Sequence, residues 1–198
     1  MSEVPSIQKP LLFLDVDGVL NARSSVHSEH YLIRVPVDKL AKSPFTRTGP
    51  PGTSLTFFVG FNPLVRTWLG ELSSVFELAW ATTWEHCANE YLSPLLGLGN
   101  LVVAESSKTP ITGLIPESLY SHVAEWKWGA VKELAGGRPL AFVDDSATRM
   151  AASPHEMLGR TAPTLIIAPE FYLTRAHVDE LLAFGVDPYG YAERHWSS

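Results

Sequence analysis

The feature that most constrains this chain is an apolar run that ends in two aspartates. The segment LLFLDVDGVLN, residues 11–21, places four apolar residues directly before Asp15 and Asp17. A short continuous apolar run bounded by turn-forming residues is typical of a strand that is buried on both faces, as in a parallel sheet. Ionised carboxylates are costly in such an interior. We therefore expect Asp15 and Asp17 to lie where the strand emerges at the edge of a sheet.

Further apolar runs follow, and helical patterns separate several of them. We predict strands at residues 11–14, 75–81, 101–104, 138–145 and 163–169, and helices at residues 62–74, 117–135 and 173–185. Strands that alternate with helices indicate an α/β domain. We predict a Rossmann-like three-layer sandwich with a mostly parallel five-stranded sheet. Residues 186–198 are expected to form a loosely attached tail.

Residues 22–60 interrupt this alternation. The segment is polar, contains SPFTRTGPPGT near its end, and holds two candidate strands, HYLIRVPV and SLTFFVGF. Such a pattern is typical of a hairpin that leaves the body of a domain. We predict that 1–198 is a single domain and that 22–60 is a flap or minimal-cap insertion.

Charge and cysteine content limit the setting in which the chain works. The 198 residues carry a formal net charge of -6, which argues against binding nucleic acid by bulk electrostatics, although a local basic groove stays possible. Cys87 is the one cysteine, so no intrachain disulfide can form, which fits a reducing compartment. The first ten residues lack the layout of a signal peptide, and no apolar stretch approaches the roughly 20 residues that cross a bilayer. We expect a cytoplasmic protein with no membrane partner; its oligomeric state stays open.

Polar residues follow three of the predicted strands. The carboxyl ends of parallel strands share one edge of a sheet, and α/β proteins bind their ligands there. A lysine in the helix before the fourth strand is a candidate cation for the same edge. These residues are Asp15, Asp17, Thr82, Thr83, Lys127, Asp144 and Asp145.

Such a group of residues is suited to phosphoryl transfer. Four carboxylates in one place repel one another, and a divalent cation removes that repulsion. Mg²⁺ prefers oxygen ligands and leaves room for waters and a substrate phosphate. A carboxylate nucleophile, a neighbouring acid, a metal and a lysine are the parts that phosphoryl transfer needs.

Four stretches resemble the motifs of the haloacid dehalogenase superfamily of phosphatases. They are LDVDGVLN, the threonine after the second strand, Lys127 and FVDD, in the same order over roughly residues 10–170. AWATTWEHCAN, AEWKWGAV and GGRPLAFVDD are similar, more narrowly, to the small haloacid dehalogenase-type domains found alone or within RNA-repair proteins.

The resemblance implies roles for the residues around the first motif. Asp15 would attack phosphorus, become an aspartyl phosphate and bind the metal. Asp17 would protonate the leaving oxygen, then activate water, and would bind the metal through its backbone carbonyl. Gly18 allows the chain to turn, so both carboxylates can approach one phosphate. We place Gly18 and Asn21 among the substrate-binding residues.

The remaining motifs complete the implied site. Thr82 would donate a hydrogen bond to the phosphoryl group, with Thr83 as the second choice. Lys127 would neutralise charge between the nucleophile and the phosphate. Asp144 and Asp145 would hold Mg²⁺ directly or through water, and either could be the inner ligand.

The predicted function is a Mg²⁺-dependent phosphomonoester hydrolase that acts on a phosphorylated small molecule or a nucleic-acid end. A non-catalytic phospho-ligand-binding module on the same fold is the alternative, and another reaction such as phosphotransfer or carbon–halogen cleavage is a third. A calcium loop of the EF-hand kind would need glutamate at its twelfth position, and counting from Asp15 that position is Val26. Asp144 and Asp145 could also simply cap the next helix.

Several residues at these motifs also have a structural interpretation. Lys127 could be a solvated helix lysine, although Trp126 and Trp128 on either side favour a pocket wall. Core positions are expected for Trp80, Trp84, Trp126 and Trp128, and an apolar wall for base stacking is the alternative.

Overall fold

The computed structural model describes residues 8–22, 28–40, 50, 52–105, 123–152 and 159–196. Within these residues the chain forms seven strands and several helices. The strands are β1 (Leu11–Leu14), β2 (Glu29–Pro36), β3 (Ser54–Phe61), β4 (Glu77–Trp80), β5 (Val102–Val103), β6 (Leu140–Val143) and β7 (Thr164–Ile167). The helices are α1 (Val37–Leu40), α2 (Val65–Val75), α4 (Val123–Ala135), α5 (Thr148–Ala151), α6 (Arg175–Val186) and α7 (Pro188–Trp196). A π-helical turn η1 (Ala88–Leu92) and a 3-10 turn η2 (Asp145–Ala147) complete the described elements.

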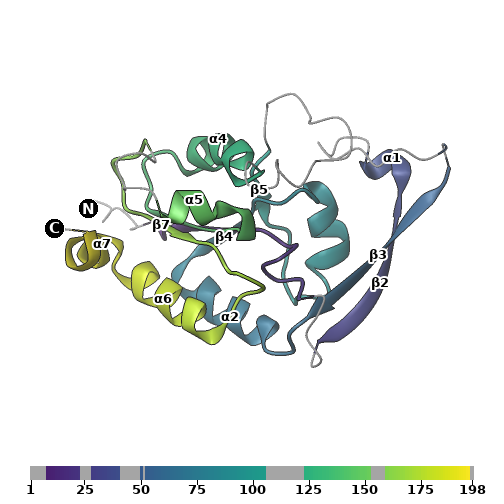
Figure 1. Cartoon of the computed structure of the whole chain (residues 1–198), viewed down its shortest axis with the longest axis horizontal. Coiled ribbons are helices and arrows are strands. Elements are labelled where there is room, and N and C mark those ends of the chain that lie inside the picture. Colours follow the sequence, from purple (N-terminus) through teal and green to yellow (C-terminus); the bar gives the residue numbers. More distant parts are fainter. Residues whose placement is uncertain are drawn as a thin grey trace, which may run out of the picture.

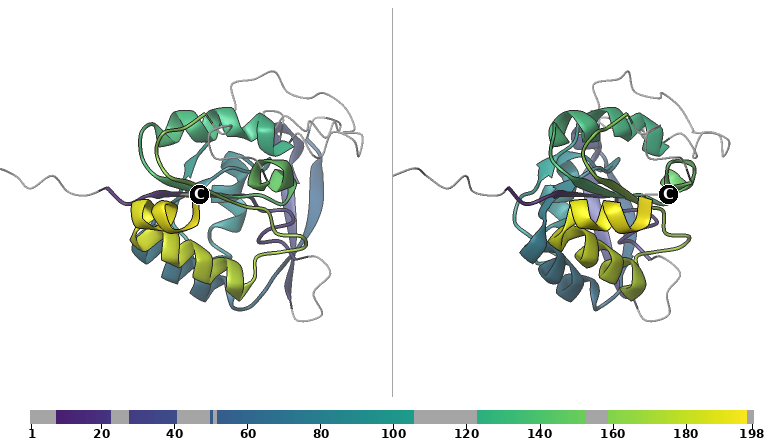
Figure 2. Two further views of the ribbon diagram at one scale, coloured as in Figure 1. Left: turned by 60° about the vertical axis from the view of Figure 1, so that its left-hand side comes forward. Right: turned by 90° about the vertical axis from the view of Figure 1, so that its left-hand side faces the viewer.

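Five of the strands form a parallel sheet in the order β5-β4-β1-β6-β7. The helices α2, α6 and α7 cover one face of this sheet, and α4 and α5 cover the other (Figure 1, Figure 2). The predicted Rossmann-like three-layer α/β sandwich is confirmed. β1 is the central strand, so its carboxyl end lies between the ends of β4 and β6.

Alternation along β1 divides the core into two parts. Leu12 and Leu14 belong to the cluster that contains the buried residues of α2 and α6. Leu11 and Phe13 belong to the cluster that contains the buried residues of α4. Successive side chains of a strand point to opposite faces, so a strand covered on both sides must be apolar throughout.

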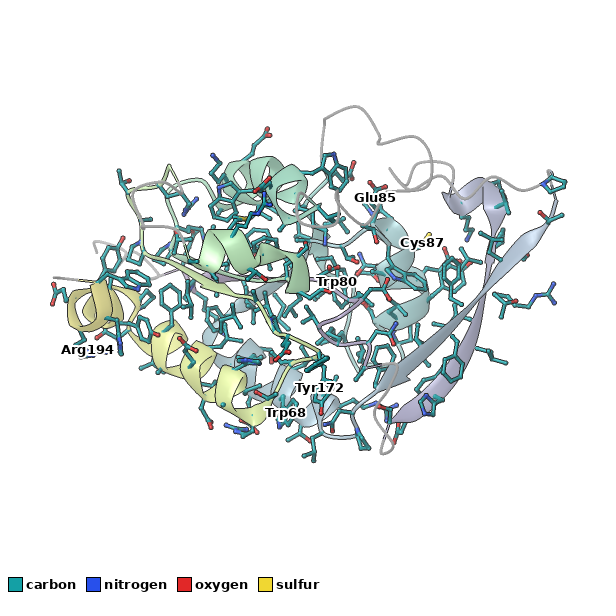
Figure 3. All side chains as sticks on the ribbon, viewed as in Figure 1. Trp68, Trp80, Glu85, Cys87, Tyr172 and Arg194 are labelled. Carbon is teal, nitrogen blue, oxygen red and sulfur yellow. The ribbon has the colours of Figure 1, made fainter. Side chains whose placement is uncertain are left out.

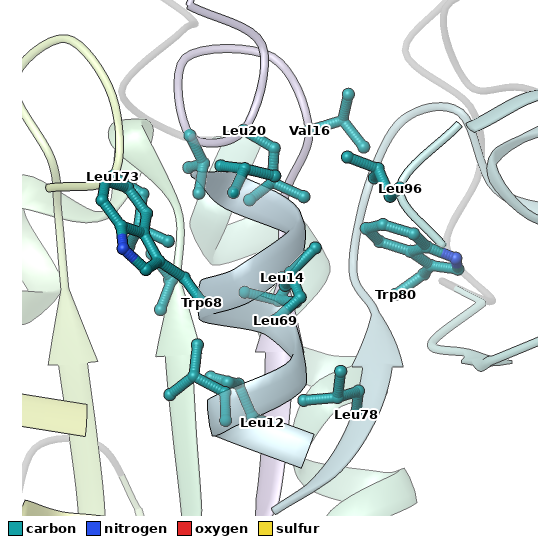
Figure 4. Packing of buried hydrophobic residues seen from close by; sticks show 14 of the residues in the cluster. Leu12, Leu14, Val16, Leu20, Trp68, Leu69, Leu78, Trp80, Leu96 and Leu173 are labelled. Atoms are coloured by element: carbon teal, nitrogen blue, oxygen red, sulfur yellow. The ribbon is translucent and has the colours of Figure 1, made fainter. Parts of the chain in front are cut away.

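Helix α2 shows how a helix is placed on this sheet. Its buried residues Val65, Trp68, Leu69 and Leu72 recur at helical spacing and form one apolar face. Figure 4 shows Leu69 beside Leu14 of β1. The helix runs through Val75, and β4 therefore starts at Glu77, two residues later than the predicted strand at 75–81.

The strands β2 and β3 form a separate antiparallel hairpin. Its inner face, which includes Ile33, Val35 and Val59, is buried in the larger core cluster. A β-bridge between Asn21, in the loop that follows β1, and Phe61 of β3 connects the hairpin to the main sheet's first loop. Residues 23–27, 41–49 and 51 of the predicted 22–60 insertion lie outside the described residues, and its function as a flap stays a prediction.

The end of the chain differs from the prediction of a loosely attached tail at 186–198. Residues 188–196 form α7, and the Tyr191 side chain is buried beside Phe184 of α6, with ring centroids 5.5 Å apart. The apolar contacts of Tyr191 and Trp196 hold this helix against α6. The sequence pattern of α7 is weak because only Tyr191 in it is buried.

Among the described residues, no helix combines the length and the apolar character that crossing a membrane requires.

Candidate functional site

Strand alternation brings Asp15 and Asp144 to the same side of the sheet. β1 and β6 are neighbours and pair Leu14 with Val143, so the next residues, Asp15 and Asp144, also lie side by side. The backbone N–H of Asp15 donates to the Val143 carbonyl at 3.0 Å. Asp15 and Asp144 continue the alternation that places Phe13 and Phe142 on the α4 face.

Lys127 reaches this pair from α4. It lies three residues after Ala124 and four before Val131, which both face the sheet, so helical spacing turns Lys127 the same way. Its Nζ is 2.6 Å from Asp15 Oδ2 and 2.7 Å from Asp144 Oδ2, and the residue is 2% exposed. The predicted lysine of the site is therefore a buried cation and not a solvated helix lysine.

Burial and charge shift the pKa values of these groups in the ways expected for a desolvated cluster. Burial alone lowers the pKa of Lys127, but the carboxylates of Asp144 and Asp15 outweigh it and raise the pKa above the usual value. Burial raises the pKa of Asp15 to about 7, Lys127 opposes the rise, and Asp144 adds to it. Burial is therefore the main reason why the Asp15 carboxyl holds its proton to a higher pH than usual.

Asp145 completes an acidic group with Asp15 and Asp144. One carboxylate oxygen from each lies within 4.8 Å of the others. Asp145 is exposed over part of its surface, yet desolvation of its carboxylate and the charge of Asp144 raise its pKa to about 6. The Asp17 carboxylate is not part of this group, and the predicted bond from its backbone carbonyl to a metal stays a prediction.

The donor set fits Mg²⁺. Three carboxylates against one ammonium leave two formal negative charges, which match one divalent cation. All three side chains offer hard oxygen ligands of the kind that Mg²⁺ prefers. Gly18 lies with φ +80° beside Asp145, and a Cβ built there would overlap the Asp145 carboxylate. Glycine at this position therefore leaves the space that the acidic group occupies.

Asp144 also performs the capping function that was the alternative interpretation. Its Oδ1 accepts a hydrogen bond from the backbone N–H of Ser146 at 2.9 Å and another from the Ser146 hydroxyl. Its Oδ2 contacts Lys127. Oδ1 thus caps the turn while Oδ2 contacts Lys127, and the capping hydrogen bonds orient the carboxylate toward Lys127.

Asp17 points to a different set of partners. Its Oδ2 accepts a hydrogen bond from Trp84 Nε1 at 3.0 Å, and its Oδ1 accepts one from Asn21 Nδ2 at 2.7 Å. Asn21 is 2% exposed and its Oδ1 accepts from the Gly60 N–H at 2.9 Å, so the predicted substrate contact of Asn21 stays a prediction. Sequence reasoning placed Trp84 in the core and missed this contact, since only its place in the loop after β4 hinted at the site.

The loop after β4 carries the two predicted threonines. The Ala81 N–H donates to the Leu14 carbonyl at 2.9 Å, which sets this loop beside the end of β1. Thr82 is buried, and its hydroxyl accepts from the Trp84 N–H at 3.3 Å, whereas Thr83 is partly exposed. Phosphate binding by either threonine stays a prediction. Glu85 closes the turn with φ +46°, a strained backbone for a non-glycine residue.

The loop after β4 and α7 lie apart along the long axis of the molecule. Glu85 and Cys87, which follow β4, lie toward the hairpin, and Arg194 of α7 lies at the other end (Figure 3). Comparison with protein-family models, curated proteins and solved structures gives no match to this chain. The resemblance to the haloacid dehalogenase superfamily therefore stays a prediction from the motifs.

Proposed function

We propose that this chain is a Mg²⁺-dependent phosphomonoester hydrolase of the haloacid dehalogenase type that works through an aspartyl phosphate at Asp15. One observation carries the proposal: Lys127 is buried between Asp15 and Asp144 at the carboxyl edge of a parallel sheet, with Asp145 alongside. A structural ion pair needs one acid for one lysine. The excess of carboxylates supports a site built for a cation, and a bound cation would in turn attract an anionic ligand.

The reaction needs two displacements at phosphorus. In the first, an Asp15 oxygen forms a bond to phosphorus while the bond to the leaving oxygen breaks, and Asp17 gives that oxygen its proton. In the second, water attacks phosphorus, Asp17 takes the proton, and the Asp15–phosphorus bond breaks to release phosphate. Mg²⁺ held by Asp15, Asp144 and Asp145 would supply positive charge to the phosphoryl oxygens.

Lys127 would contribute a fixed positive charge throughout these steps. Its ammonium contacts the proposed nucleophile directly, so it offsets the repulsion between the Asp15 carboxylate and an incoming phosphate. Thr82, in the loop beside the end of β1, would donate a hydrogen bond from its hydroxyl to the phosphoryl group.

The proposed substrate is a phosphorylated small molecule or a nucleic-acid end. The motif resemblance to RNA-repair domains supports the second choice, and the net charge of -6 favours contact with a terminal phosphate over a long polynucleotide track. A reducing, cytoplasmic setting is part of the proposal, since Cys87 is a buried free thiol.

The test is hydrolysis of p-nitrophenyl phosphate, with and without Mg²⁺, by the wild type, by Asp15→Asn and by the control Asp38→Asn on exposed α1. We expect Mg²⁺-dependent turnover that Asp15→Asn abolishes and Asp38→Asn leaves unchanged. Acid-quenched wild type should carry a phosphoryl group on Asp15 by mass spectrometry. Phosphate binding without any turnover would favour the non-catalytic module, and full activity of Asp15→Asn would remove Asp15 as the nucleophile.

A further inference from the structure

Two donors hold both oxygens of the Asp17 carboxylate. Trp84 Nε1 donates to Oδ2 at 3.0 Å, and Asn21 Nδ2 donates to Oδ1 at 2.7 Å. An indole N–H can only donate, and the amide nitrogen of asparagine likewise. The carboxylate cannot rotate about its Cβ–Cγ bond without losing one of these hydrogen bonds. The two donors therefore fix the plane and the direction of the group.

Both donors are buried. Trp84 is 5% exposed and Asn21 is 2% exposed. A buried donor that loses its acceptor cannot turn to water instead, so breaking either contact leaves an unsatisfied N–H. The arrangement is for this reason stiffer than the same two hydrogen bonds would be on an open surface.

Both donors are also tied to the hairpin. Asn21 Oδ1 accepts a hydrogen bond from the Gly60 N–H of β3 at 2.9 Å. The Trp84 ring packs against Phe57 of β3, with centroids 4.8 Å apart and planes tilted by 53°. Two separate routes thus connect β3 with the same carboxylate, one through a side-chain amide and one through an aromatic contact.

We propose that Trp84 and Asn21 are positioning residues for Asp17, through which the β2–β3 hairpin sets the direction of the carboxylate that transfers the proton. This inference rests on the proposed function, because it takes Asp17 as the acid that protonates the leaving oxygen. A misdirected acid slows departure of the leaving group and leaves substrate binding unchanged. The loss therefore falls on kcat, and it is largest for esters with a poor leaving group.

A pair of matched substitutions tests the indole contact. Trp84→Phe keeps an aromatic ring against Phe57 but removes the N–H donor. Trp80→Phe removes another buried indole donor, whose acceptors are Asn89 Oδ1 at 3.0 Å and Ser93 Oγ at 3.3 Å. With phenyl phosphate, a poor leaving group, we expect Trp84→Phe to lower kcat by roughly tenfold to a hundredfold, with KM little changed. With p-nitrophenyl phosphate the loss should be smaller, and Trp80→Phe should affect the two esters equally.

A second measurement follows the hydrogen bond itself without turnover. The indole N–H resonances of Trp84 and Trp80 can be assigned in a ¹H–¹⁵N spectrum from the two phenylalanine variants. Asp17→Asn should shift the Trp84 indole resonance, because it replaces the charged acceptor, and should leave the Trp80 resonance in place.

The outcomes separate the two levels of the proposal. Suppose that the wild type is active but that Trp84→Phe, like Trp80→Phe, lowers kcat equally for the two esters, or that Asp17→Asn does not shift the Trp84 indole resonance. Either result overturns the positioning role and leaves the proposed hydrolase in place. If the wild type turns over neither ester with Mg²⁺, the proposed function is overturned, and the catalytic meaning of the Trp84 contact with it.

Discussion

At the scale of single residues, Lys127 supplies the positive charge that contacts both buried carboxylates of the site, Asp15 and Asp144. Replacing Lys127 by methionine keeps most of the length of the side chain but leaves Asp15 and Asp144 buried without a cation. Removing one partner of a buried ion pair costs about 3–5 kcal/mol. In a chain of this size, each kcal/mol lowers Tm by about 2–4 °C. We therefore expect Lys127→Met to unfold about 6–20 °C below the wild type in a metal-free thermal melt.

Lys132→Met is the matched control on the same helix. The Lys132 Nζ lies 5.9 Å from the Trp128 ring centroid, and a cation–π contact of this kind contributes only about 0.5–1 kcal/mol at an accessible site. Added Mg²⁺ should restore part of the Tm of Lys127→Met. A Tm loss no larger than that of Lys132→Met would show that the buried pairs do not stabilise the fold.

Gly18 tests whether close approach to Asp145 is needed for the metal. Gly18→Ala puts a Cβ on a left-handed backbone, which costs about 1–2 kcal/mol of stability, and the same Cβ displaces the Asp145 carboxylate. Gly97→Ala has the backbone cost alone, because φ there is +70° and nothing lies within 4 Å of the added Cβ. We expect both variants to lose stability, Gly18→Ala by more, and a Mg²⁺ affinity reduced about tenfold or more only in Gly18→Ala, measured by calorimetry. Equal affinities in the two variants would contradict the assignment of Asp145 as a ligand.

The convergence of Asp15, Lys127 and Asp144 could be predicted because each position follows from a short-range rule. Strand ends of a parallel sheet share an edge, and alternation along β1 and β6 fixes the face. The partners of Asp17 follow no such rule. Trp84 is 67 residues away in the chain, and its ring direction depends on the turn after β4 and on Phe57, which a linear pattern does not record.

At the scale of elements, strands were predicted well where period-two or apolar patterns have clear ends. The predicted hairpin strands HYLIRVPV and SLTFFVGF correspond to β2 and β3 within one residue at each end. The helix predicted at 173–185 ends at Gly185, a residue type that often terminates helices, yet α6 continues to Val186. A Cβ at Gly185 would lie 2.6 Å from the Phe76 ring, so glycine serves close packing against the end of α2 and not termination.

Helix α7 gives a direct test of the packing that replaced the expected tail. Tyr191 is 6% exposed and contacts Phe184, and its hydroxyl donates to Glu180 Oε1 at 2.9 Å. Tyr191→Ala should cost about 3 kcal/mol in urea unfolding, by loss of buried aromatic surface. Tyr189→Ala on the same helix should change stability by less than about 0.5 kcal/mol, because Tyr189 is 59% exposed.

Equal and small effects of these two tyrosine substitutions would support a loosely attached C-terminal segment after all. Because α7 lies away from the loop after β4 along the long axis of the molecule, neither substitution should alter Mg²⁺ binding (Figure 3).

At the scale of the whole molecule, the fold concentrates negative charge at one edge of its sheet. The parallel topology places the ends of β1 and β6 together, so carboxylates that are far apart in the chain become neighbours in a buried place. Without a metal, burial and, after it, the charge of Asp144 raise the pKa of Asp15 to about 7 and that of Asp145 to about 6. Proton uptake and cation binding are therefore alternative ways to offset the cost of these buried negative charges.

This competition predicts how stability depends on pH. Between about pH 4 and 7 the folded, metal-free protein binds more protons at Asp15 and Asp145 than the unfolded chain does, so its free energy of unfolding falls as pH rises through that window. Mg²⁺ binds the ionised carboxylates. As the pH decreases below the pKa of these groups, the apparent affinity for Mg²⁺ falls about tenfold per pH unit for each proton that binding must displace. We expect the increase in Tm caused by Mg²⁺ to be small at pH 5.5 and large at pH 8.

Calorimetry in two buffers of different ionisation enthalpy checks the cause, because Mg²⁺ binding at pH 6.5 should release protons. Asp145→Asn removes one carboxyl that titrates and one ligand, so it should bind Mg²⁺ more weakly and release fewer protons on binding at pH 6. An increase in Tm that is the same at pH 5.5 and pH 8 would mean that Mg²⁺ binds elsewhere. The raised pKa values of Asp15 and Asp145 would then reflect burial alone, and the acidic group would need no cation to explain it.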